Sequence, residues 1–130
     1  MGKNTADKLI QSPILIVDDD EETRMFLTEF LRCIGFSGAV TAKNGTQALE
    51  QLEKISPCLI LLDYKLPDLD GFELLRRIKR RHPGLPVIMM TAYPAISGME
   101  KVIQEGAVDL VIKPLDLRYL EQKVISGLVH

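Results

Sequence analysis

Five short runs of apolar residues, separated by longer amphipathic stretches, constrain the fold of this chain more than any other feature. The runs occupy residues 14–17, 39–42, 58–62, 87–90 and 110–112, and the second is the weakest. Each run is too short for a helix and too continuous for a half-exposed strand. Strands that are buried on both faces of a parallel sheet have this pattern. The chain is therefore expected to contain five buried strands.

The stretches between the runs have helical periodicity, with apolar residues at intervals of three or four. Gly35 can end the first helix, and Asp70 and Glu73 form a capping box at the start of the third. The fourth contains Gly98 and is expected to be the least stable. The inward-facing stripes are Leu27, Phe30, Leu31 and Ile34; Ala48, Leu49, Leu52 and Ile55; Phe72, Leu75 and Ile78; Ile96, Met99, Val102 and Ile103; and Leu117, Leu120, Val124 and Leu128.

Five strand–helix units in 130 residues predict an α/β fold with a doubly wound parallel sheet. A content of 46% apolar and 26% charged residues is usual for a globular domain of this size, which can bury a sufficient core without disulfides or metals. Residues 1–11 precede the first strand, and we expect them to be a flexible extension of a single domain over residues 12–130.

Composition also narrows the classes of partner. The net charge of −2 gives no overall basic surface, so direct DNA binding by this domain is not expected. No apolar run is long enough to span a membrane, and the first residues lack the apolar core of a signal peptide. Cys33 and Cys58 match no metal-binding spacing and lie in apolar stretches, which predicts two small buried side chains in a reducing cytoplasm.

Polar side chains follow four of the five expected strands. Asp18 and Asp19 follow the first run, Asp63 the third, Thr91 the fourth and Lys113 the fifth. The carboxyl ends of parallel strands meet at one edge, where ligands bind in such folds. Three neighbouring carboxylates repel one another, and a hard cation such as Mg²⁺ relieves that repulsion. Together with a hydroxyl and an ammonium group, they suit transfer of a phosphoryl group to a carboxylate.

Each of these residues also has a structural explanation when taken alone. Asp20, with two glutamates after it, is expected only to cap the next helix. Asp63 can open a turn, Thr91 can be a strand-end hydroxyl, and Lys113 can be a solvated charge. The combination favours a site, because four strands that end in complementary groups are hard to obtain by accident.

Four sequence motifs resemble the receiver domain of bacterial two-component response regulators. They are LIVDDDEETR, LLDYKLPDLDGFELL, IMMTAY and GAVDLVIKP, in the order and spacing of that family. The resemblance covers about residues 12–129. It is closest to the single-domain receivers of phosphorelays and to the receivers that precede enhancer-binding ATPase domains. It implies a flavodoxin-like sheet of five parallel strands, in the order 2-1-3-4-5, with five helices.

The resemblance also implies the roles of the acidic residues. Asp63 would be the phosphoacceptor and would take its phosphoryl group from the phosphohistidine of a sensor histidine kinase or a histidine phosphotransfer protein. Asp19 would bind Mg²⁺ directly together with Asp63, and Asp18 would act mostly through water. The backbone carbonyl of Lys65 would complete the protein's share of the coordination.

Further residues would modulate this chemistry. Thr91 would bind a phosphoryl oxygen and shift on phosphorylation, and Lys113 would pair with another oxygen and precede a cis peptide bond. Leu110 occupies a place where the family often has Tyr or Phe, so the aromatic form of the family's switch is not expected. Lys65 and Tyr93 would overhang the path of an attacking water, which predicts slow loss of the phosphoryl group.

Three other functions are compatible with parts of this pattern. A haloacid-dehalogenase-type phosphatase also uses a strand-end aspartate and Mg²⁺, but it needs a second aspartate where Lys65 stands. A flavodoxin-type electron carrier must hold a phosphate in its first loop, which the acidic residues there would repel. A receiver-like module that is never phosphorylated would not need the complete set of acidic residues, threonine and lysine at the strand ends. The expected function is therefore a signalling switch that alters the binding of a downstream protein or output domain and catalyses only its own phosphorylation and dephosphorylation.

Overall fold

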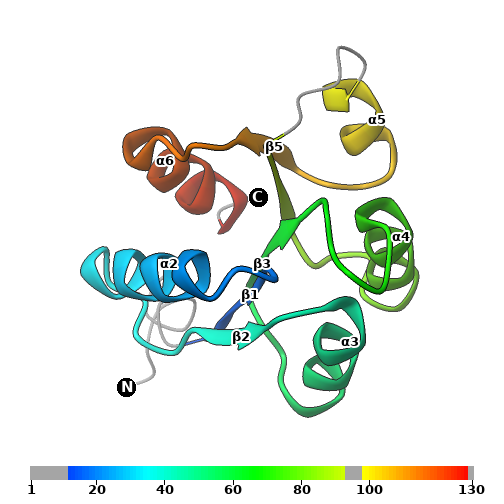
Figure 1. Cartoon of the computed structure of the whole chain (residues 1–130), viewed down its shortest axis with the longest axis horizontal. Helices are drawn as coiled ribbons and strands as arrows, with labels where there is room; N and C mark the ends of the chain where they lie inside the picture. Colours follow the sequence, from blue (N-terminus) through cyan, green and yellow to red (C-terminus); the bar gives the residue numbers. More distant parts are fainter. Residues whose placement is uncertain (1–11, 93–97, 129–130) are drawn as a thin grey trace, which may run out of the picture.

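The computed structural model describes residues 12–92 and 98–128, so the expectation for residues 1–11 lies outside the described part of the chain. Figure 1 shows a parallel sheet of five strands in the order β2-β1-β3-β4-β5, and five helices within the described residues. This arrangement confirms the predicted fold class. The strands are β1 (Ile14–Val17), β2 (Val40–Ala42), β3 (Leu59–Asp63), β4 (Val87–Thr91) and β5 (Asp109–Ile112). The helices are α2 (Glu21–Cys33), α3 (Gly45–Lys54), α4 (Gly71–Arg81), α5 (Gly98–Gln104) and α6 (Leu117–Leu128).

The sheet separates two apolar cores, and this explains why the strands are continuously apolar. Helices α2 and α6 cover one face, and α3, α4 and α5 cover the other (Figure 1). Successive side chains of a strand point to opposite faces. In β1, Ile14 and Ile16 pack in the core under α2 and α6, whereas Leu15 and Val17 pack under the other helices. No helix within residues 12–92 and 98–128 is long and apolar enough to cross a membrane.

Two helix ends follow the sequence signals closely. Gly35 has a φ of 110°, which favours glycine, and its N–H donates to the carbonyl of Arg32 at 3.1 Å. The N–H of Phe36 donates to the carbonyl of Leu31 at 2.8 Å, so both bonds of a glycine-terminated helix end are present. At the start of α4, the Asp70 carboxylate accepts the N–H of Phe72 at 2.7 Å, which confirms Asp70 as the cap. The Glu73 carboxylate pairs with the Arg77 guanidinium at 3.1 Å instead of closing the predicted capping box.

Some expectations about burial are wrong. Cys33 is exposed, because it lies two residues beyond the buried Leu31 and therefore about 200° around the helix. The helical periodicity predicts that Ile103 and Leu117 face inward, but they are 45% and 40% exposed. Ile103 directly follows the buried Val102, and a rotation of about 100° per residue turns it outward. Leu117 is the first residue of α6 and lies three residues before Leu120, the first buried residue of that helix. Ile96 lies outside the described residues.

Helix α5 is linked to α4 by side chains. The guanidinium of Arg76 donates two hydrogen bonds to the carboxylate of Glu105, at 2.9 and 3.1 Å. The ammonium of Lys101 lies 4.7 Å from the centre of the Phe72 ring, which allows a cation–π contact. Gly98 is the first residue of α5 within the described part of the chain. The short helix thus depends on contacts with α4 as well as on its packing against the sheet.

Gly71 allows α4 to begin directly against the segment that leaves β3. Its N–H donates to the carbonyl of Tyr64 at 3.0 Å. A Cβ atom at this position would lie 2.5 Å from the same oxygen and 2.7 Å from the Tyr64 Cα. These are backbone atoms, so they cannot move away as a flexible side chain could. The Asp-Gly pair therefore caps the helix and lets it approach the end of β3.

We predict that Gly71→Ala destabilises the protein by about 1–3 kcal/mol, because the added methyl group overpacks against backbone. Gly84→Ala is the matched control, since a Cβ there meets no atom within 4 Å. Its effect on the free energy of unfolding is expected to stay within about 0.5 kcal/mol. Urea denaturation of both variants checks this difference, and equal stabilities would contradict it.

Candidate functional site: an acidic edge of the sheet

The strands bring the predicted site residues to one edge of the sheet. Asp63 and Thr91 end β3 and β4, and Asp18 and Lys113 directly follow β1 and β5. Neighbouring strands pair in register, with Thr91 opposite Ile112, and the N–H of Lys113 donates to the Thr91 carbonyl at 2.7 Å. Side chains from four strand ends thus lie at the carboxyl edge, as the sequence predicts.

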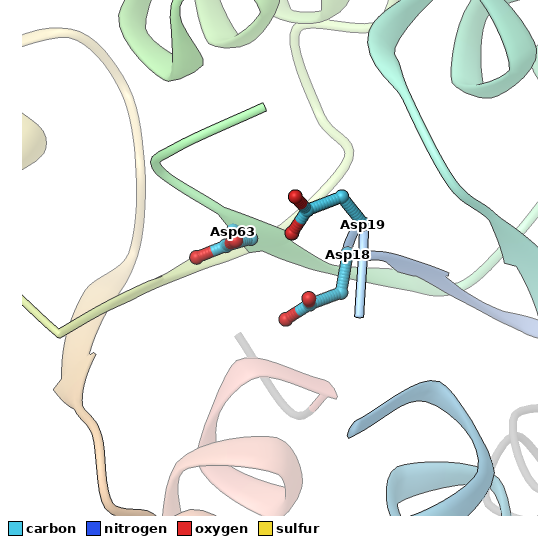
Figure 2. A group of neighbouring side chains, drawn as sticks. All are labelled: Asp18, Asp19 and Asp63. Carbon is cyan, nitrogen blue, oxygen red and sulfur yellow. The ribbon is translucent and has the colours of Figure 1, made fainter. Parts of the chain in front are cut away.

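Three carboxylates converge at this edge. One oxygen atom from each of Asp18, Asp19 and Asp63 lies within 4.8 Å of the others, and Figure 2 shows the three side chains together. Asp18 is fully buried and Asp63 is 6% exposed, whereas Asp19 is exposed. Like charges this close favour protonation or binding of a cation.

Lys113 compensates part of this negative charge. Its ammonium nitrogen lies 2.7 Å from Asp18 Oδ2 and 3.4 Å from Asp63 Oδ1. Burial disfavours the charged amine, but the hydrogen bond to Asp18 and the charges of both aspartates outweigh it and raise the pKa of Lys113. Burial, followed by the charge of Asp18, raises the pKa of Asp63 to about 6. The ionised form of Asp63 is therefore disfavoured in the folded protein.

Hydrogen bonds fix both the backbone and the side chain of Asp18. Its N–H donates to the Ala42 carbonyl at 3.1 Å, and its own carbonyl accepts from the guanidinium of Arg24 at 2.8 Å. The carboxylate accepts the N–H of Asp20 at 2.9 Å and the Lys113 ammonium. Both carboxylate oxygens thus already have protein donors, which leaves the exposed Asp19 as the more available ligand.

Arg24 belongs to the motif LIVDDDEETR, but sequence reasoning gave it no role. Its position in the sequence could have predicted its contact, because an arginine in the second turn of a helix that follows the acidic loop can reach back to that loop. Asp20, in contrast, lies outside the acidic cluster. Its carboxylate accepts the N–H of Thr23 at 3.2 Å, which confirms it as the cap of α2.

The donor set fits a hard divalent cation. Three ionised carboxylates and one ammonium group leave two negative charges at the edge. Oxygen donors are the ligands that Mg²⁺ takes, and it usually keeps several waters, which the exposed position of Asp19 permits. The acidic edge therefore has the chemistry of a magnesium site.

The residues expected to modulate the site have different surroundings. Lys65 is exposed and lies in a short antiparallel bridge with Asp70. Leu110 is 5% exposed and packs in the core beneath α3, α4 and α5, so an aliphatic side chain fills the place of the family's aromatic residue. The peptide bond between Lys113 and Pro114 is cis, as the resemblance implied. Tyr93 lies outside the described residues.

Fold and site together define an α/β domain with three converging carboxylates at the carboxyl edge of its sheet. The family model of the response regulator receiver domain matches residues 14–125. The chain therefore belongs to the response regulator receiver domain family. This membership favours neither the phosphatase nor the electron-carrier alternative.

Relatives of known sequence and structure agree with this assignment. The transcriptional regulatory protein ZraR of Klebsiella oxytoca is 38% identical over 120 residues, which cover 92% of the chain and 27% of ZraR. The DNA-binding transcriptional regulator NtrC of Escherichia coli K12 is 39% identical over 104 residues, 80% of the chain and 22% of NtrC. The chain thus spans about a quarter of the length of these curated relatives.

Solved structures show the same fold. A two-component response regulator from Clostridium difficile superposes with a TM-score of 0.86 at 31% identity, over 92% of this chain and 98% of that one. A CheY-like receiver domain protein from Methanospirillum hungatei gives a TM-score of 0.84 at 31% identity, over 91% and 94% of the two chains.

The raised pKa of Asp63 predicts how pH affects the metal-free protein. A carboxyl group whose pKa rises on folding, here from 3.8 to about 6, stabilises the fold fully below pH 4 and loses that effect as the pH rises through 6. The loss amounts to up to about 3 kcal/mol. In EDTA, Asp63→Asn should therefore gain stability over the wild type at pH 7.5 and little at pH 4. Urea denaturation at both values tests this, and a gain that does not change with pH would contradict it.

Proposed function

We propose that this domain is a signalling switch that accepts a phosphoryl group on Asp63. The observation that carries the proposal is the convergence of Asp63 with Asp18, Asp19 and Lys113 at the strand ends of a receiver-family chain. An oxygen of the Asp63 carboxylate would attack the phosphorus of a phosphohistidine. An O–P bond forms as the P–N bond breaks, and the electron pair of that bond returns to the imidazole nitrogen of the donor.

Lys113 and Thr91 supply what the phosphoryl group would need at this edge. The Lys113 ammonium already lies 3.4 Å from Asp63, so it can neutralise an oxygen of a group bound there. Thr91 ends the neighbouring strand and offers a hydroxyl for a second oxygen. Capture of the phosphoryl group by these two residues would favour the conformation in which both can reach it.

Mg²⁺ would be held by the carboxylates of Asp19 and Asp63 and by the backbone carbonyl of Lys65, with Asp18 acting through water. The ion, when bound, would neutralise charge on the transferring phosphoryl oxygens. The protein's own part is to keep the ligands together. Asp18, fixed by Lys113 and by the N–H of Asp20, holds the start of the acidic loop in place.

The partners follow from this chemistry. A sensor histidine kinase or a histidine phosphotransfer protein would donate the phosphoryl group, and a downstream protein or an output domain would read the phosphorylated state. We place this exchange in the cytoplasm and assign the domain no catalysis beyond its own phosphorylation and dephosphorylation. Lys65 and Tyr93, two residues beyond Asp63 and Thr91, would shield the phosphoryl group and prolong its lifetime.

We predict that Asp63→Ala abolishes labelling by acetyl phosphate in the presence of Mg²⁺, since it removes the attacking oxygen. The control is Asp116→Asn, which alters a carboxylate whose contacts are with the N–H groups of Arg118 and Tyr119 at the start of α6. It should take up one phosphoryl group at about the wild-type rate. Intact-mass spectrometry measures both. Labelling of Asp63→Ala at the wild-type rate would disprove the assignment.

We also predict that Asp19→Asn weakens Mg²⁺ binding more than Asp20→Asn. The first removes a direct ligand, whereas the second changes only a helix cap. The loss for Asp19→Asn should be about tenfold or more, since even residues that merely orient metal ligands contribute that much. Isothermal titration calorimetry compares the two, and equal affinities would show that Asp19 is not a ligand.

A further inference from the structure

Asp68 connects the loop between β3 and α4 to the start of another helix. One oxygen of its carboxylate accepts the N–H of Gly45 at 2.8 Å. The other accepts the N–H of Thr46 at 2.9 Å and the Thr46 hydroxyl at 2.7 Å. Desolvation opposes ionisation, but these hydrogen bonds lower the pKa of Asp68 to about 2. Asp68 is thus a charged group at the positive end of α3, whose first N–H groups lack partners within the helix.

The same loop is closed at its base and packed at its tip. The N–H of Gly71 donates to the Tyr64 carbonyl at 3.0 Å, and Lys65 bridges Asp70. Leu69 packs against Gly45 so closely that a Cβ atom on the glycine would lie 2.6 Å from the leucine Cδ1. Asp68 and Leu69 therefore fix the tip of the loop on α3, opposite its closed base.

These contacts connect the two segments that carry the acidic residues by a second route, which runs through β2 and α3. Asp18, at the end of β1, donates its N–H to Ala42 at the end of β2. Helix α3 begins three residues after Ala42, and Asp68 joins that helix to the loop that follows Asp63. The two segments that carry the acidic residues are thus linked through α3 as well as through the paired strands.

This second connection opposes the repulsion among the three carboxylates. Three carboxylates within 4.8 Å push their loops apart when no cation is bound. The strands hold Asp63, but Lys65 lies beyond the end of β3, in the loop that Asp68 holds. Without that link, the loop can relax outward and must be drawn back when a cation binds. Preorganising the ligands removes this cost.

We propose that Asp68 is a positioning residue for Mg²⁺: by fixing the β3–α4 loop on α3, it keeps the Lys65 carbonyl in place for the ion beside the strand-held Asp63 carboxylate. The inference rests on the proposed function, because it assumes that Mg²⁺ binds at the acidic edge.

The test compares Asp68→Ala with Asn44→Ala in the full chain. Asn44 caps the same helix, accepting the N–H of Gln47 at 2.8 Å, and it belongs to the segment before α3 instead of the β3–α4 loop. Both variants lose a cap and should be less stable to heat. Only Asp68→Ala should weaken Mg²⁺ binding, by about tenfold, as residues that orient metal ligands do. Asn44→Ala should stay within about twofold of the wild type.

Two further measurements make the outcome decisive. Asp68→Asn keeps an oxygen acceptor for Gly45 and should recover part of the lost affinity, and it replaces Asp68→Ala if that variant does not fold. In EDTA, hydrogen exchange over residues 64–70 should be faster in Asp68→Ala than in Asn44→Ala. Equal Mg²⁺ affinities of Asp68→Ala and the wild type, or equal losses in the two alanine variants, would overturn the positioning role. A wild type that binds no Mg²⁺ at millimolar concentration would overturn the proposed function, and the inference with it.

Discussion

The repulsion among three carboxylates is the constraint around which this domain is built. One carboxylate oxygen from each of Asp18, Asp19 and Asp63 lies within 4.8 Å of the others, so negative charges on them repel one another. Lys113 lies between the two buried ones and lowers the cost of their charge, although the pKa of Asp63 still stands at about 6. The carboxylates stay together because Asp63 ends a fully buried strand and Asp18 is held at both its backbone and its side chain. Keeping these charged groups together at this edge thus lowers the stability of the fold.

The way the strands are buried explains why the sheet could be predicted. The strands β1, β3 and β4 send alternate side chains into two separate cores and have no exposed face. β1 has no polar residue, and in β3 and β4 the only polar residue is the last one. Those last residues are then the ones at the functional edge. The same pattern that predicts the strands therefore also predicts Asp63 and Thr91 as site residues, because polar groups at the ends of buried strands have little other reason to be there.

The sequence was less informative where contacts depend on distant parts of the chain. Asp68 lies in the motif LPDLDG of the β3–α4 loop, but its partners Gly45 and Thr46 begin α3. No local sequence pattern connects Asp68 with these two residues. The guanidinium of Arg24 donates to the Asp18 carbonyl, a contact that its position in α2 allows but does not require. An apolar stretch does not define which face of a helix Cys33 occupies, and it is exposed. Periodicity defines the face on which Leu117 lies but not how far along the helix that face stays packed. Contacts between loops and the ends of helices are thus the part of this site that needed the structure.

The link between α4 and α5 has a consequence for how solution conditions act on the domain. The guanidinium of Arg76 and the carboxylate of Glu105 that join them are 40% and 27% exposed, whereas Asp18 in the pair with Lys113 is fully buried. Dissolved ions screen exposed charges over a distance of about 8 Å at physiological ionic strength, and they reach buried pairs far less. Added salt therefore loosens α5 from its neighbour before it weakens the acidic edge. The ionic strength of the surroundings thus acts on the helix at the periphery separately from the chemistry at the centre.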